Sequence, residues 1–250
     1  MNNTEDIMFF KEKAQKYLDY AENLLYDADI CEIIENIKQY ENKLYCKKSD
    51  LYLGYFNPCP VADLIVGKCD RGNIYKKKPL GKNIITYYFD DNKLRMAEDE
   101  ALYYVWFYAD TENVCILGFK KNNSKALSYI TLCKYRDSEI VSITDLNCTE
   151  NVKSFPFSFF GAEMLCIKGK EKEYMFELTE KEYIYKENHI EVLKIAKIDS
   201  FNKNCRVKEY IFEYADDNYA SYRFSDTQYK IANKRKFNEL NKIPDFSDIF

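Results

Sequence analysis

Carboxylates are the side chains whose type and spacing come closest to a chemical site. They gather in four groups, Asp90/Asp91, Glu98/Asp99/Glu100, Asp110/Glu112 and Asp216/Asp217. Paired carboxylates can bind calcium or cleave a glycosidic bond by acid–base chemistry, but both activities require the groups to converge in space. Adjacent residues of a strand point to opposite faces, and these groups fall where turns are expected. We therefore interpret them as caps of turn backbone, and a hydrolase that uses clustered carboxylates remains an alternative.

The other reactive side chains lack the partners that catalysis needs. His189 is the only histidine and begins an expected strand, so we interpret it as a surface residue. Cys59 lies between two prolines and could be an exposed nucleophile, but no basic residue near it in sequence favours a thiolate. The basic segment 76–82 could collect phosphate, yet no GxxxxGK motif is present and a solvated loop is the simpler reading. The sequence thus predicts no catalytic residues, no metal and no cofactor.

Composition narrows the class of partner and the compartment. The nine cysteines have no CxxC pair and mostly lie in apolar runs, which favours reduced core thiols and a cytoplasmic protein. The N-terminus lacks the basic-then-apolar order of a secretion signal. The longest apolar run, residues 101–109, is far shorter than a membrane span of roughly 20 residues. With a net charge of −4 and few basic clusters, the chain predicts neither nucleic-acid nor membrane binding.

Two regions of helical or irregular sequence come before the expected sheet. Residues 5–47 carry apolar side chains at helical spacing, with a capping box from Asp29 to Glu32 between two stripes, and this pattern predicts a helical hairpin. Residues 54–81 hold 7 of the 12 glycines and prolines, which predicts a turning connection without long elements.

The remainder predicts a β-meander. Residues 84–224 contain about ten runs of alternating aromatic and β-branched residues separated by polar turns. Residues 226–241 follow a capping box from Ser225 to Gln228 and predict a C-terminal helix. We expect one α+β domain over residues 1–250, in which the strands form a twisted sheet, a sandwich or a partly closed barrel.

A repeated phrase marks the expected hairpin tips. An aromatic residue, one or two acids and a polar turn recur in YYFDDNKL, FYADTENVCIL, KYRDSEIVSI and EYADDNYASYRF. Rigid aromatic anchors beside carboxylates are typical of protein-binding hot spots that steer a basic partner. The candidate partner-binding residues are Tyr88, Asp90, Asp91, Tyr108, Asp110, Tyr214, Asp216, Asp217 and Tyr219. Turn chemistry alone would also place Asp and Asn at these positions.

The segments KNIITYYFDDNKL and KEYIFEYADDNYASYRF carry a family resemblance. In a lysine-, asparagine- and tyrosine-rich chain without a catalytic motif, they resemble the β-meander immunity proteins of bacterial polymorphic toxin systems, over residues 82–224. The resemblance implies a non-enzymatic inhibitor that occludes the active site of a cognate toxin, with an acidic surface facing a basic toxin domain. Besides the hydrolase, a barrel that carries an apolar small molecule remains an alternative.

Overall fold

The computed structural model describes residues 4–49, 51–58, 71–137, 139–150, 165–186, 189–199, 204–215 and 218–230. In these ranges the helices are α1 (Thr4–Leu24), α2 (Ile30–Lys38) and the short 3-10 helix η1 (Gly54–Phe56). The first strands are β1 (Lys43–Lys47), β2 (Asn73–Tyr75), β3 (Ile84–Asp90), β4 (Lys93–Glu98), β5 (Leu102–Tyr108), β6 (Asn113–Lys120) and β7 (Asn123–Arg136). The later strands are β8 (Glu139–Glu150), β9 (Cys166–Lys168), β10 (Glu173–Lys186), β11 (His189–Asp199), β12 (Asn204–Ala215), β13 (Asn218–Phe224) and β14 (Thr227–Lys230).

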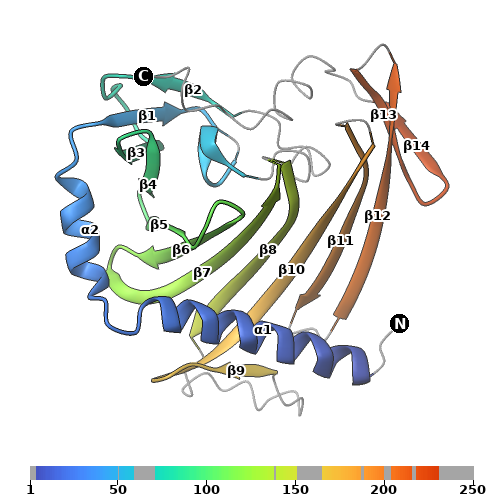
Figure 1. The fold of residues 1–250 in the computed structure, drawn as a ribbon, viewed down its shortest axis with the longest axis horizontal. Coiled ribbons are helices and arrows are strands. Elements are labelled where there is room, and N and C mark those ends of the chain that lie inside the picture. The colour runs from blue at the N-terminus through green and yellow to red at the C-terminus, as the bar shows by residue number, and fades with distance from the viewer. Residues whose placement is uncertain are drawn as a thin grey trace.

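All fourteen of these strands belong to one antiparallel sheet. The strand order is β14-β13-β12-β11-β10-β8-β7-β6-β5-β4-β3-β1-β2, and β9 pairs with β10 beyond the end of β11. Within the described residues the sheet is open, because β14 and β2 lie at opposite ends of this order. The sheet is strongly curved, and α1 crosses its strands while α2 stands beside β4 to β7 (Figure 1). The α+β class and the antiparallel meander are therefore confirmed.

The sheet has a buried cluster on each face. On the helix side, Ala14, Leu18 and Ala21 of α1 recur every three or four residues and are 0% exposed. They pack with Leu117 and other residues of the sheet, and burying one leucine side chain stabilises by roughly 1.5–3 kcal/mol. On the opposite face Leu53 and Phe56, which flank or belong to η1, pack with the aromatic residues of β3. The helices therefore form a layer on one face of the sheet, and the η1 segment lies on the other face.

The two N-terminal helices are confirmed, but α2 stands at an angle to α1 instead of packing along it as a hairpin (Figure 1), and the predicted end of this region at residue 47 is wrong. Asp29 caps α2 as expected, because its Oδ1 accepts a hydrogen bond from the N–H of Cys31 at 2.9 Å. The helix α2 then ends at Lys38, and residues 43–47 form β1 between β2 and β3. Leu44 and Cys46 alternate with partly exposed neighbours, so a two-residue period holds where a helical stripe was expected.

One further strand and the predicted C-terminal helix also differ from the prediction. Strand β4, with the sequence KLRMAE, is poor in β-branched and aromatic residues and is not one of the roughly ten runs that predict strands in residues 84–224. Its pairing with β3 and β5 overrides that propensity. The predicted start of a C-terminal helix is also wrong: Ser225 has a φ of 53° in a turn, and residues 227–230 form β14. Residues 231–241 lie outside the described residues.

The segment rich in glycine and proline contains only short elements where it is described. Residues 54–56 form η1 and residues 73–75 form β2. Residues 59–70, which include Cys59, lie outside the described residues.

Candidate protein-binding edge

The meander brings the repeated phrases to one edge of the sheet. Strands β3, β5, β7, β10 and β12 occupy alternate places in an antiparallel order and run in the same direction. The turns that follow β3, β5 and β7, and the described ends of β10 and β12, therefore lie at the same edge. This edge is the side of the sheet where these strands end, not one of its outermost strands. We call it the tip edge, and it includes the turns at residues 91–92 and 109–112. The carboxylates of the turn between β4 and β5 lie at the opposite edge.

The described aromatic residues of the phrases pack in the core. Phe89, Tyr108 and Tyr135 of the phrases, and Tyr185 at the equivalent place in β10, each occupy the last or second-last position of a strand that ends at the tip edge, and all lie in the cluster on the η1 side. The hydroxyl of Tyr108 donates to the carbonyl of Leu94 at 2.8 Å, and that of Tyr185 donates to the carbonyl of Ile140 at 2.8 Å. The repeated phrases are therefore alike in structure as well as in sequence, because their aromatic residues take the same place at the strand end.

At the turn between β3 and β4, the three candidates have different surroundings. Tyr88 is buried on the helix side beneath Lys43, whose Nζ lies 5.0 Å from the ring centroid. Burial, with the charge of Glu98, raises the pKa of its phenol. Asp90 forms an ion pair with Arg95 at 2.8 Å. Asp91 is exposed in the turn with a φ of 50°, so its carboxylate faces solvent.

At the next turn, Asp110 caps the backbone. Its Oδ1 accepts hydrogen bonds from the N–H groups of Glu112 and Asn113, both at 2.7 Å. The side-chain amide of Asn113 also donates to this carboxylate, and these bonds hold the pKa of Asp110 below its ordinary value. The carboxylate therefore remains charged while it fixes the turn.

Tyr108 connects these two turns. Lys93 Nζ and the guanidinium carbon of Arg95 each lie 5.8 Å from its ring centroid. Burial raises the pKa of Tyr108 to about 12. Since Arg95 also pairs with Asp90, the structure brings Asp90, Tyr108 and Arg95 together.

The turn between β12 and β13 is described only in part. Tyr214 and Tyr219 are partners in the register of the two strands, and their side chains are outside the described part of the chain. Asp216 and Asp217 lie outside the described residues.

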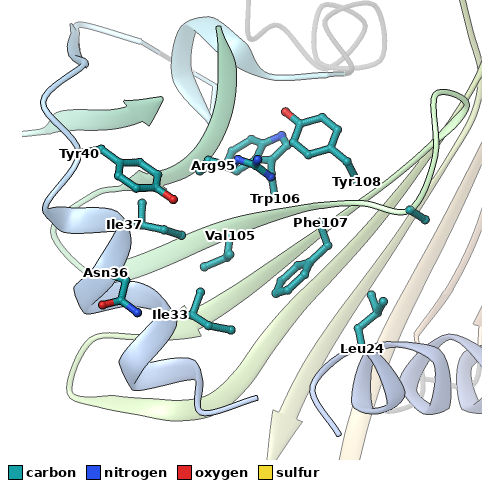
Figure 2. A pocket seen from close by; sticks show the side chains of 11 residues that line it. Leu24, Ile33, Asn36, Ile37, Tyr40, Arg95, Val105, Trp106, Phe107 and Tyr108 are labelled. Carbon is teal, nitrogen blue, oxygen red and sulfur yellow. The ribbon is translucent and has the colours of Figure 1, made fainter. Parts of the chain in front are cut away.

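A pocket lies next to the first two turns, and no pattern in the sequence predicts it. Its volume is about 510 Å³, and its apolar walls are Leu24, Ile33, Ile37, Val105 and Phe107. Figure 2 shows Ile33 and Ile37 of α2 facing Val105 and Phe107 of β5. Arg95, Tyr108 and Ala109 also line the pocket and connect it to the tip edge. The pocket depends on where α2 lies against β5, which no local pattern encodes.

Other groups with reactive side chains are satisfied structurally. Asp145 binds Lys181 at 2.7 Å and accepts a hydrogen bond from Thr131 at 2.7 Å, which links β7, β8 and β10. Asp99 caps the backbone of Leu102 at 2.8 Å. The part of the chain that the structure describes holds no cluster of three or more His, Cys, Asp or Glu residues suited to a metal. The backbone of His189 begins β11, and its side chain is not described.

Comparison with known proteins found no matching family model, no matching curated protein and no matching solved structure. Neither α1 nor α2, the α-helices of the described ranges, is long and apolar enough to cross a membrane.

Proposed function

We propose that this chain is a non-enzymatic binding protein that engages a basic protein partner through the tip edge. The observation that carries the proposal is the convergence of two neighbouring turns at that edge. Asp91 belongs to the first turn, and Asp110 with Glu112 to the second. All three residues are exposed, and Tyr108 and Arg95 hold the two turns side by side.

Exposed carboxylates on fixed turns suit recognition by charge. A group of like charges raises the rate at which an oppositely charged partner associates, and this gain decreases as salt increases. The backbone caps of Asp110 keep its turn in one conformation, which lowers the entropy lost on binding. The tyrosines support the turns from within the core.

The narrower form of the proposal is an immunity protein that neutralises a cognate bacterial toxin. Its support is the resemblance of residues 82–224 to β-meander immunity proteins, together with these acidic turns. An inhibitor of this kind would bind the basic surface of a toxin domain and cover its active site.

The experiment begins with co-purification of the full chain and the product of the neighbouring gene. Association and dissociation are then measured at low and moderate salt for the parent and for Asp91→Asn with Glu112→Gln. The matched control is Asp226→Asn with Glu171→Gln, because both residues are exposed at the opposite edge. The tip variant should associate severalfold more slowly and lose salt dependence, whereas the control should behave like the parent. Equal association rates for both variants would refute the proposal, and toxicity assays with the partner test the narrower form.

A further inference from the structure

We infer that the pocket between α2 and β5 receives an apolar side chain of the partner, carried on a segment with basic residues on either side. This inference rests on the proposed function and specifies the chemistry of the partner. The volume of about 510 Å³ lies within the roughly 300–1,000 Å³ typical of ligand pockets. The walls are aliphatic and aromatic, so the favourable occupant is apolar.

Arg95 provides a specific polar contact in this pocket. One of its nitrogens, Nη2, binds Asp90 at 2.8 Å, while its Nε is buried without a hydrogen-bond partner. Because that nitrogen is enclosed, an inserted segment can meet only the exposed part of the guanidinium, whose side chain is 33% exposed. A backbone carbonyl next to the apolar side chain is a suitable acceptor for those N–H groups. Asn36 of α2 and Tyr40, which follows α2, also line the pocket. Their side chains can form hydrogen bonds with a peptide backbone.

The charged residues beside the pocket favour a basic peptide segment over a small apolar acid as the occupant. Arg95 and the exposed Lys93 are cations beside the pocket that would attract an acid, but Asp90 already pairs with Arg95. Asp91, Asp110 and Glu112 are exposed on the two turns next to the pocket. An anionic ligand would approach these carboxylates at a cost, whereas lysine or arginine residues flanking the inserted side chain would be attracted.

The single tryptophan of the chain makes this inference testable. Trp106 lines the pocket and is 8% exposed, and its ring packs on the η1 side of β5, opposite Val105 and Phe107, so binding is measured by calorimetry as well as by its fluorescence. The probes are end-blocked peptides, Lys-Lys-Phe-Lys-Lys and the same peptide with serine in place of phenylalanine. Partial burial of the phenyl ring predicts binding that is about tenfold tighter for the first peptide. Both affinities should fall as salt is raised.

Two variants test the location. Asn36→Phe places a ring in the pocket mouth from α2 and should bring the affinity ratio of the two peptides to one. Glu35→Phe is the matched control, because Glu35 is exposed on the same helix and does not line the pocket, so its ratio should equal that of the parent. Ala109→Phe repeats the test from the β5 side.

The outcomes separate this inference from the proposed function. Equal, salt-sensitive binding of the two lysine peptides would overturn the pocket inference and leave the acidic tip edge supported. If Glu-Glu-Phe-Glu-Glu binds as tightly as the lysine peptides, both the basic partner and this inference are wrong. A phenylalanine preference that persists unchanged in Asn36→Phe and Ala109→Phe would also overturn the inference, since the ring would bind elsewhere.

Discussion

The hydroxyl of Tyr87 should control how the η1 segment is held on the sheet. Tyr87 is 0% exposed, and its hydroxyl donates to the carbonyl of Leu53 at 2.9 Å and accepts from the N–H of Tyr55 at 2.9 Å. Its ring meets Phe56 edge to face, with centroids 4.7 Å apart. Gly54 lies under this hydroxyl with a φ of +63°, and a Cβ there would intrude on the Tyr87 oxygen and lie 2.7 Å from Cδ1 of Ile85.

The magnitudes follow from these contacts. Tyr87→Phe leaves a carbonyl and an N–H without their partner, and each such group costs about 1–3 kcal/mol when buried. Because one of the two bonds is only partly buried, we expect about 2–4 kcal/mol in total. Gly54→Ala adds a left-handed penalty of about 1–2 kcal/mol and displaces the hydroxyl, so it should cost about 3–5 kcal/mol.

The test is a double-mutant cycle measured by urea unfolding. When phenylalanine replaces Tyr87, the oxygen that the added methyl group at position 54 would strike is absent. The double variant should therefore be at least about 1 kcal/mol more stable than the sum of the single changes predicts. Tyr185→Phe is a control that removes the bond to the carbonyl of Ile140 far from the η1 segment, and should cost about 1 kcal/mol. Additive effects of the changes at residues 54 and 87 would refute the reasoning.

Three further outcomes follow from the same structure. Asp110→Asn should melt below the parent at neutral pH: since hydrogen bonds lower the pKa of the folded-state carboxyl, their contribution is present above its unfolded pKa of 3.8 and is lost as pH falls through the folded value. A difference in melting temperature that stays constant down to pH ~3 would contradict this. The pKa of Tyr108 is raised to about 12. Its contribution to the free energy of unfolding is therefore complete below pH ~10 and is lost as the pH rises to about 12. In alkaline unfolding experiments, Tyr108→Phe should therefore lose less stability than the parent over that window. Dithiothreitol and EDTA should each leave the melting temperature unchanged, since Cys115 and Cys148 are buried thiols with pKa values raised to about 12; a fall of several degrees would reveal a structural bond or metal.

Much of the fold follows from local pattern, and the differences occur where two patterns overlap. Ala14 and Leu18 define a helix face without ambiguity. Leu44 fits both the helical stripe before it and the strand alternation that it actually joins, and only pairing with β3 decides between them. The sequence from Ser225 to Gln228 has the letters of a capping box, but Phe224 pairs with Thr227 across a turn. In each case the pairing of strands, rather than the local pattern, determines the structure.

The candidate site was also predictable only in part: its turns were, and its pocket was not. The acidic turns carry their own signal, and an antiparallel meander necessarily puts alternate turns at one edge. The pocket is different, because Ile33 and Ile37 predict an apolar helix face and give no indication of which strand that face meets. Its position beside Arg95 and Tyr108 requires the packing of α2 against β4 and β7.

The repeated phrase separates stability from binding along the chain. Its aromatic member ends a strand and packs in the cluster on the η1 side, as Phe89, Tyr108 and Tyr135 do. Its acidic member stands in the turn that follows, where Asp91 is exposed to solvent. Truncating the aromatic residues should therefore reduce the free energy of unfolding, whereas neutralising Asp91 should change association with a charged partner and leave stability nearly intact. One sequence pattern can supply both properties because the last residues of each strand face the core, while the next residues are the first to leave the sheet.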